Sequence, residues 1–353
     1  MTRARLMMIS VATTTAARAW AGIGADELQW SQLPPLPEAV GVAGAFAGVS
    51  GGKLVVAGGA NFPGRMPWAG GVKQWQDVVY VLDQTNVSWR VAGKLPRPLA
   101  YGVSLTTESG VLCIGGSDAM RHYADTFLLT EDGGPITIRP LPSLPVPLAN
   151  AAGALVGTVA YVVGGAETLG EQAALSRFFA LDVAVPAPTW RELPPFPGEA
   201  RILAAAGATA DALYLVGGAA LRRQDDRVRR VYLRDAWKYS PASRNWKRLA
   251  DLPRPSVAAP SPAPIIDATL LLVGGDDGSL VNFQPPEEHP GFPRVAQALD
   301  LRRGTWSQWN DLPVARASLP VVLWRGFFVL PSGEVRPGVR SPEVWRVRGP
   351  GAH

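Results

Sequence analysis

The stretch KLVVAGG, at residues 53–59, decides the fold because it joins an apolar run to a pair of glycines. Such a run is typical of a strand covered on both faces, and the glycines permit positive φ and close backbone approach where the strand turns. The same ending recurs at residues 115–116, 164–165, 217–218 and 274–275, with spacings of 57, 49, 53 and 57 residues. A degenerate copy, FFVLPSG, ends at Gly333. The chain is therefore predicted to consist of six repeats.

Each repeat continues in the same order. A short aromatic or apolar strand follows the glycines, as in DVVYVLD at 77–83 and DAWKYS at 235–240. Most copies then carry a tryptophan on the next strand, at Trp89, Trp190, Trp246 and Trp306. A Leu-Pro pair ends each unit, because proline cannot donate a ladder hydrogen bond. Four such strands bury little surface alone, and radial repetition supplies the neighbouring sheets that they need, with tryptophan filling the gap between sheets.

The two ends of the chain complete one repeat between them. A Leu-Pro pair at Leu33-Pro34 has no repeat before it, and its neighbour Trp30, in LQWSQLP, is typical of a fourth strand. The first three strands of that repeat, ending in PEVWRV at 342–347, lie at the C-terminus. We therefore expect an all-β, six-bladed propeller over residues 28–348, a single domain closed by an N-terminal strand. This pattern of glycine pair, aromatic strand and tryptophan resembles the kelch repeat, whose period is about 50 residues.

The N-terminus predicts an export signal over residues 1–22. Arg3 and Arg5 precede an uncharged stretch at 6–17, and small residues suited to cleavage follow at Ala17, Ala19 and Ala21. We expect a periplasmic or secreted protein, with a non-cleaved N-terminus as the alternative. No stretch approaches the ~20 apolar residues needed to cross a bilayer.

Composition excludes several classes of site. One cysteine, Cys113, cannot form a disulfide framework or a thiolate metal cluster, and its strand, GVLCIGG, indicates a core position. Three histidines, none paired at ligand spacing, give no sign of a metal site. The net charge is +5, yet the densest basic segment, residues 222–234, includes two aspartates, so we expect no nucleic-acid partner.

Polar residues that follow the glycine pairs belong at the rim or central channel of a propeller, where ligands bind. These residues are Asn61 and Arg65, Asp118 with Arg121 and His122, Glu167, Arg201, Asp276 with Asp277, and the segment 334–340. The sixth repeat stands out, because GEVRPGVR at 333–340 sets Glu334 beside Arg336 and Arg340. A carboxyl group beside guanidinium groups makes an acid/base unit, with a surface turn and incidental ion pair as the alternative.

Three segments resemble the N-acetylneuraminate epimerases, or sialic acid mutarotases, which are bacterial kelch propellers. They are GVAGAFAGVSGGKLVVAGG at 41–59, YGVSLTTESGVLCIGG at 101–116 and GEVRPGVR at 333–340. The last is similar to the family's G-E-x-[KR]-P-G-x-R turn. The order of the segments is similar to that of a circularly permuted branch of the family.

The resemblance implies an isomerase that interconverts the α and β anomers of N-acetylneuraminate without a metal or organic cofactor. It implies Glu334 and Arg340 as the catalytic pair, with Arg340 anchoring the sugar carboxylate. Weaker substrate-binding candidates are Arg201, Asn61, Tyr101 and Arg336. One departure is Leu99, which stands where the family has arginine, with Arg97 two residues earlier; it indicates a shifted substrate or an arginine contributed from elsewhere.

Two other functions remain open at this point. The fold also serves non-catalytic modules that bind a glycan or a protein on the rim. The same chemistry also fits another acidic or a neutral monosaccharide as the substrate.

Overall fold

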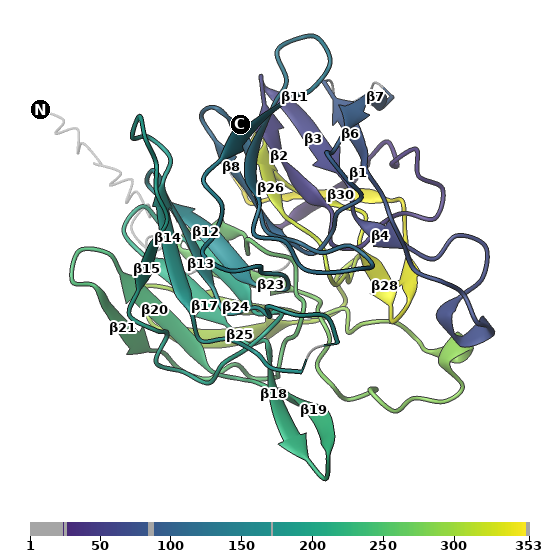
Figure 1. Ribbon diagram of the computed structural model, residues 1–353. Coiled ribbons are helices and arrows are strands. Elements are labelled where there is room, and N and C mark those ends of the chain that lie inside the picture. The colour runs from purple at the N-terminus through teal and green to yellow at the C-terminus, as the bar shows by residue number, and fades with distance from the viewer. Residues whose placement is uncertain (1–23, 25–26, 84–87, 171, 351–353) are drawn as a thin grey trace, which may run out of the picture.

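The structure is a computed structural model that describes residue 24 and residues 27–83, 88–170 and 172–350. Six four-stranded antiparallel sheets stand around a central axis (Figure 1), which confirms the predicted six-bladed propeller. Helical structure in these residues is confined to short turns such as η2 (Pro67–Ala69) and η3 (Pro286–Glu288). The expected export signal lies outside the described residues. No helix in the described ranges is long and apolar enough to cross a membrane.

Each blade runs from an innermost strand to an outermost one. Blade 1 comprises β2 (Phe46–Ser50), β3 (Lys53–Ala57), β6 (Val78–Leu82) and β7 (Arg90–Lys94), and blade 2 comprises β8 (Val103–Thr107), β9 (Gly110–Ile114), β10 (Thr126–Thr130) and β11 (Thr137–Leu141). Blade 3 comprises β12 (Ala152–Val156), β13 (Val159–Val163), β14 (Phe178–Asp182) and β15 (Arg191–Leu193), and blade 4 comprises β16 (Ala205–Ala208), β17 (Leu213–Val216), β20 (Ala236–Ser240) and β21 (Asn245–Arg248). Blade 5 comprises β22 (Ile265–Ile266), β23 (Thr269–Val273), β24 (Ala296–Asp300) and β25 (Thr305–Trp309).

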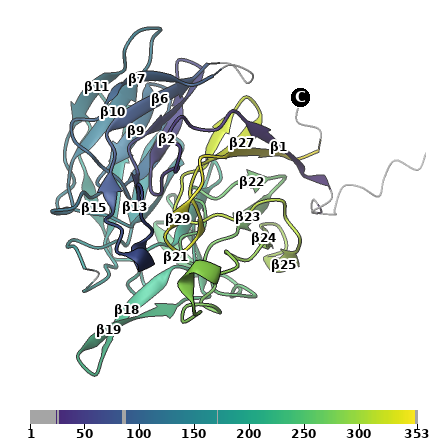
Figure 2. The ribbon, with the colours of Figure 1, turned by 90° about the vertical axis from the view of Figure 1, so that its right-hand side faces the viewer.

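Blade 6 closes the ring as predicted. It comprises β26 (Val322–Trp324), β27 (Phe327–Pro331), β30 (Val344–Arg348) and β1 (Gln29–Leu33). Strand β1 pairs antiparallel with β30, with Trp30 opposite Val347. Figure 2 shows β1 beside the C-terminal strands. Joining the two ends of the chain in one sheet holds the first and last blades together.

The hydrophobic core lies between the blades, where the strands are buried on both faces. Cys113 in β9 is fully buried there, as predicted, and burial raises the pKa of its thiol well above the usual value. The tryptophans do more than fill space. The indole N–H of Trp89 donates to the carbonyl of Pro34 at 2.8 Å, and that of Trp306 donates to the carbonyl of Ala250 at 2.9 Å. Each bond joins neighbouring blades, so it gives the indole N–H a partner and fixes the packing of the ring.

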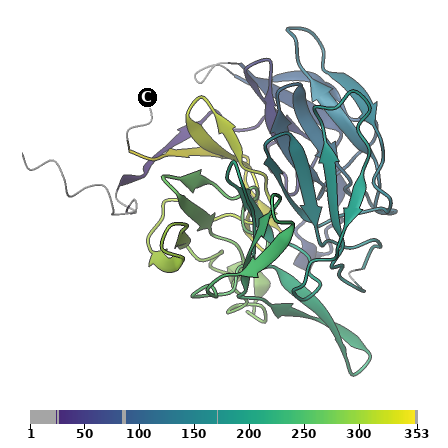
Figure 3. The ribbon, with the colours of Figure 1, turned by 90° about the vertical axis from the view of Figure 1, so that its left-hand side faces the viewer.

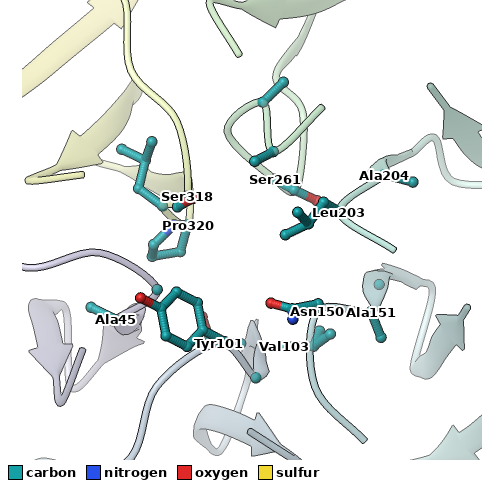
Figure 4. A pocket seen from close by; sticks show the side chains of 17 residues that line it. Ala45, Tyr101, Val103, Asn150, Ala151, Leu203, Ala204, Ser261, Ser318 and Pro320 are labelled. Atoms are coloured by element: carbon teal, nitrogen blue, oxygen red, sulfur yellow. The ribbon is translucent and has the colours of Figure 1, made fainter. Parts of the chain in front are cut away.

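Six residues, one before each innermost strand, form a closed ring of backbone hydrogen bonds around the axis. Each amide donates to the carbonyl in the preceding blade over 2.6–2.9 Å, and each residue has φ between +56° and +64°. The members of this floor ring are Gly44, Tyr101, Asn150, Leu203, Ala258 and Ser318. Figure 4 shows Tyr101, Asn150 and Leu203 around the axis. The ring narrows the channel and forms a floor beneath the space at one end.

Short insertions rise from the blades at that end. Each follows the second strand of its blade: β4 (Ala60–Asn61) with β5 (Gln74–Trp75), β18 (Ala219–Gln224) with β19 (Arg227–Tyr232), and β28 (Glu334–Arg336) with β29 (Val339–Arg340). Figure 3 shows the β18–β19 hairpin projecting from the body of the propeller. These insertions surround the mouth of the channel.

Candidate functional site

A cavity of about 580 Å³ lies above the floor ring, and we call it the mouth cavity. Its walls come from several blades and from the insertions around the channel. The charged side chains in its lining are Lys73, Arg230, Asp276 and Glu334. A cavity of this size with charged groups of both signs suits a small polar ligand.

The repeat places one residue of each blade at an equivalent position, and the residues of blades 2, 5 and 6 at this position line the mouth cavity. An isolated β-bridge pairs the residue before each floor-ring member with a residue that follows the glycine pair, or Gly333 in blade 6. The residues at these six bridge positions are Ala60, Ser117, Ala166, Ala219, Asp276 and Glu334. Four are small, so only blades 5 and 6 bring a carboxyl group to the cavity by this route.

Glu334 forms the central ion pair of the site. It stands opposite Arg340 in the β28–β29 hairpin, and Nη2 of Arg340 lies 2.8 Å from Oε1 of Glu334. The tight turn between them depends on Gly338, with φ +80°, where a Cβ atom would lie 2.8 Å from Pro67 of blade 1. The sequence Glu-Val-Arg-Pro-Gly-Val-Arg thus folds back so that its first and last residues meet.

Arg340 lies behind Glu334 and outside the residues that line the mouth cavity. Only 2% of its side chain is exposed, against 17% for Glu334. Its guanidinium group lies over the ring of Phe62, 4.7 Å from the centroid. Its Nε and Nη1 are buried and have no hydrogen-bond partner within the described part of the chain. Among the described residues, Glu334 is therefore the ion-pair partner of Arg340.

Burial raises the pKa of Glu334 above its ordinary value. The charges of Arg340, Lys73 and Arg230 act in the opposite direction, and the charge of Asp276 adds to the effect of burial. Desolvation disfavours the ionised form, and the three cations recover only part of that cost. A raised pKa makes this carboxyl group a stronger base than an ordinary glutamate, which suits a group that must accept a proton and return it.

Asp276 occupies the equivalent bridge position in blade 5 and has a different environment. Its Oδ2 accepts a hydrogen bond from the Tyr232 hydroxyl at 2.7 Å, and its Oδ1 accepts one from the amide of Gly278 at 2.9 Å. Because Tyr232 lies in β19, Asp276 ties the β18–β19 hairpin to the mouth of the channel. Arg230 is on the same strand, two residues before Tyr232.

Of the weaker candidates, only Tyr101 lines the mouth cavity, as a member of the floor ring. Asn61 is fully buried; its amide donates to the carbonyl of Gly41 at 3.0 Å and accepts from Gln76 at 3.1 Å. Arg336 donates to the carbonyls of Glu287 and His289. The structure therefore places Asn61 and Arg336 among the contacts that hold the loops, away from the cavity lining.

Arg201 does not converge with Glu334. Its side chain is 1% exposed and outside the cavity lining, and it forms a bidentate pair with Asp235 at 2.7 and 2.8 Å. It also donates to the carbonyls of Glu199 and Gly217. Burial alone would raise the pKa of Asp235, but hydrogen bonds and charge from Arg201, with the Trp237 indole, hold it below its ordinary value.

Equivalent positions in other blades show what an arginine at position 99 would do. Leu99, Arg201 and Arg316 each stand two residues before a floor-ring member, so they occupy equivalent positions. Arg316 is also buried, and it pairs with Glu343. At this position an arginine therefore pairs with the carboxylate that precedes the third strand of its blade, and Leu99 instead packs in the core.

Arg97 supplies the missing guanidinium group in blade 2. It pairs with Asp125, which precedes β10 just as Asp235 precedes β20. The loss of the arginine at position 99 is thus a rearrangement of a structural ion pair. Neither Leu99 nor Arg97 lines the mouth cavity, so both alternatives raised by the sequence for this substrate contact stay open.

Sequence reasoning did not single out Lys73 or Arg230. Both stand on insertions, outside the repeat pattern, so the spacing of glycine pairs gives no sign of them. Aromatic residues on either side of Lys73, at Trp68 and Trp75, are the only local signal. Within the described ranges, no three His, Cys, Asp or Glu side chains are grouped to hold a metal ion.

The sequence model described as N-acetylneuraminate epimerase matches residues 9–138 and 141–284. The chain belongs to the N-acetylneuraminate epimerase family. The matched residues include most of the propeller, and Glu334 and Arg340 lie beyond them, so their place in the site depends on the GEVRPGVR turn and on the geometry above.

Individual relatives match over shorter stretches. The chain is 42% identical over 121 residues to an N-acetylneuraminate epimerase from Brucella suis, with 31% of each chain covered. It is 44% identical over 126 residues to one from Yersinia enterocolitica, with 30% of this chain and 31% of the relative covered. The matches thus span about a third of the length of these curated relatives.

A solved structure extends the likeness to the whole ring. The structure of YjhT superposes with a TM-score of 0.66 at 15% identity, covering 89% of this chain and 97% of that one. At this identity the likeness shows the fold, and it agrees with the family assignment.

Proposed function

We propose that this protein is a sialic acid mutarotase, an isomerase that interconverts the α and β anomers of N-acetylneuraminate. The observation that carries the proposal is Glu334, a largely buried carboxyl group with a raised pKa that lines the mouth cavity and is paired with Arg340. Family membership supports the choice of sugar. The N-terminal pattern at residues 1–22 supports export to the periplasm or beyond the cell.

The reaction needs one group that exchanges a proton with two oxygens. In ring opening, ionised Glu334 takes the proton of the anomeric hydroxyl, and the protonated carboxyl returns it to the ring oxygen as the bond to the anomeric carbon breaks. Rotation about the adjacent carbon–carbon bond presents the other face of the ketone, and the reverse steps close the ring. A positioned acid/base of this kind contributes about 10²- to 10⁴-fold.

Arg340 serves in this proposal as a positioning residue. It bonds Oε1 of Glu334, which leaves Oε2 outside that ion pair and fixes the orientation of the carboxyl group. It also keeps the pKa of Glu334 from rising further. Because Arg340 is not part of the cavity lining, another residue must contact the sugar carboxylate.

The test is NMR spectroscopy of anomeric equilibration after one anomer of N-acetylneuraminate is dissolved with the purified protein. We expect the wild type to accelerate equilibration and Glu334→Gln to lose about 10²- to 10⁴-fold of that acceleration. Glu192→Gln, which changes an exposed carboxyl paired with Arg177, is the control and should retain activity.

Absence of acceleration by the wild type would contradict the proposal. Acceleration of neutral sugars alone would assign the same chemistry to another substrate. Tight binding of a glycan or protein without any effect on sugar mutarotation would identify a non-catalytic module.

A further inference from the structure

The substrate proposed above places its charge next to the reacting atom. In N-acetylneuraminate the carboxylate is bonded to the anomeric carbon, so a group that binds it must lie close to the acid/base residue. Arg340 is close to Glu334 but lies behind it, outside the cavity lining. Among the described lining residues, Lys73 and Arg230 carry the positively charged side chains that can pair with a carboxylate in the cavity.

Lys73 is held in place by aromatic rings. Its Nζ lies 5.1 Å from the ring centroid of Tyr101, 5.5 Å from that of Trp75 and 6.0 Å from that of Phe62. Rings attract an ammonium group through their quadrupoles and leave its charge intact. The three rings therefore fix the position of a cation without neutralising it.

Two other lysines are neutralised by carboxylates. Lys53 lies 2.8 Å from Glu131, and Lys94 lies 3.2 Å from Asp77. Within the described part of the chain, Lys73 has no carboxylate within 4.0 Å, although it lines a cavity that contains two carboxyl groups. A positioned cation that lacks an ion pair in a cavity is suited to an anionic ligand.

Phe62 brings this cation to the acid/base pair. One side chain, that of Phe62, contacts both the Lys73 ammonium and the Arg340 guanidinium, and Arg340 is bonded to Glu334. Lys73 is also close enough to act on the charge of Glu334. The arrangement matches a substrate in which the anionic group and the reacting oxygens are attached to the same carbon.

We propose that Lys73 binds the carboxylate of the sugar and makes the mouth cavity selective for acidic over neutral sugars. This inference rests on the proposed mutarotase function. It assigns to Lys73 the carboxylate contact for which Arg340 is not placed.

The test compares N-acetylneuraminate with its methyl ester, which keeps the ring and the anomeric hydroxyl but lacks the charge. The wild type should have a higher kcat/KM for the acid than for the ester. Lys73→Met should reduce this preference by about 10- to 100-fold, mainly through KM for the acid, because a hydrogen bond to a charged group is lost. Lys73→Arg, which keeps the charge, should restore much of the preference.

The ratio of kcat/KM for the acid to kcat/KM for the ester removes effects that act on both substrates equally. Loss of the Lys73 charge also changes the pKa of Glu334, but that change affects acid and ester alike. Lys238→Met is the matched control, since Lys238 also lies over an aromatic ring, 5.8 Å from that of Tyr214, but does not line the mouth cavity. It should leave the ratio unchanged.

A folded Lys73→Met variant whose acid-to-ester ratio equals that of the wild type would overturn the inference and leave the mutarotase proposal intact. If the wild type accelerates neither sugar, the mutarotase proposal is wrong. Calorimetry then tests Lys73 by itself: equal affinity of wild type and Lys73→Met for N-acetylneuraminate overturns the inference, and weaker binding by the variant supports it.

Discussion

Arg201 and Arg340 are both buried arginines with a carboxylate partner, yet their surroundings differ. Arg201 uses its guanidinium nitrogens on Asp235 and on two backbone carbonyls. Arg340 bonds Glu334 through Nη2, while its Nε and Nη1 are buried without a described partner. Asp235 has a lowered pKa, and Glu334 has a raised one.

The difference separates a structural ion pair from a reactive one. A guanidinium group whose donors are satisfied holds its carboxylate in the ionised form and joins parts of the fold. A partly satisfied pair next to a cavity leaves the carboxyl able to change its protonation state. Both arginines are candidates in the sequence, and their hydrogen-bond partners distinguish them.

Among substitutions of Arg340, Arg201 and Arg97, the largest effect is expected from Arg340→Met. Without the guanidinium group, burial acts on Glu334 with less opposition, so the pKa of this carboxyl rises further. The ionised base is then scarcer at low pH, and mutarotation on the acidic side of the pH profile should fall by about 10²-fold, comparable to loss of general base catalysis. The pH dependence of kcat/KM measures this effect.

A shift of the activity profile towards higher pH would identify Arg340 as a positioning residue. An unchanged profile with a uniformly lower rate would instead indicate a structural role. Activity equal to that of the wild type at every pH would contradict any role for the pair.

Arg201→Met should affect stability and leave the chemistry unchanged. Removing one partner of a buried pair leaves Asp235 without its cation and costs about 3–5 kcal/mol of unfolding free energy. Denaturant unfolding at neutral pH measures the loss. The folded variant should keep the wild-type kcat/KM, and a large loss of activity would place Arg201 in the site after all.

The destabilisation caused by Arg201→Met should depend on pH. Because the folded-state pKa of Asp235 is lowered, its contribution is present above the unfolded-state pKa of about 3.9 and is lost as pH falls through the folded-state value. The difference between wild type and variant should therefore shrink in acid. A constant difference from neutral pH to about pH 2 would contradict this linkage.

The smallest effect is expected from Arg97→Ala. The pair of Arg97 and Asp125 is partly exposed, with 36% and 41% of the side chains accessible, so its loss should cost less than about 1 kcal/mol. Activity should not change, because Arg97 does not line the mouth cavity. A clear rise in the KM of the Arg97→Ala variant would instead indicate a substrate contact in blade 2.

Repeat spacing accounts for much of the site as well as the fold. Aligning the glycine pairs brings Asp276 and Glu334 to equivalent bridge positions, and both were candidates from the sequence. The insertions lie outside the repeat, so its spacing does not predict where their residues stand. Lys73 and Arg230 stand at positions that no repeat predicts, so their approach to Glu334 depends on how the loops fold back over the mouth of the channel.

Glycine pairs, tryptophans and Leu-Pro pairs specify a six-bladed ring closed by its own N-terminus, because each is a local requirement of backbone conformation or of packing between neighbouring sheets. The GEVRPGVR turn likewise specifies which carboxyl meets which arginine. Contacts between residues far apart in the chain decide the rest. They determine which arginine has all its hydrogen-bond donors satisfied, which lies behind the cavity wall and which cation faces the ligand. Those contacts exist only when the blades and insertions have packed, since burial and charge at a site are sums over neighbours that local sequence does not contain.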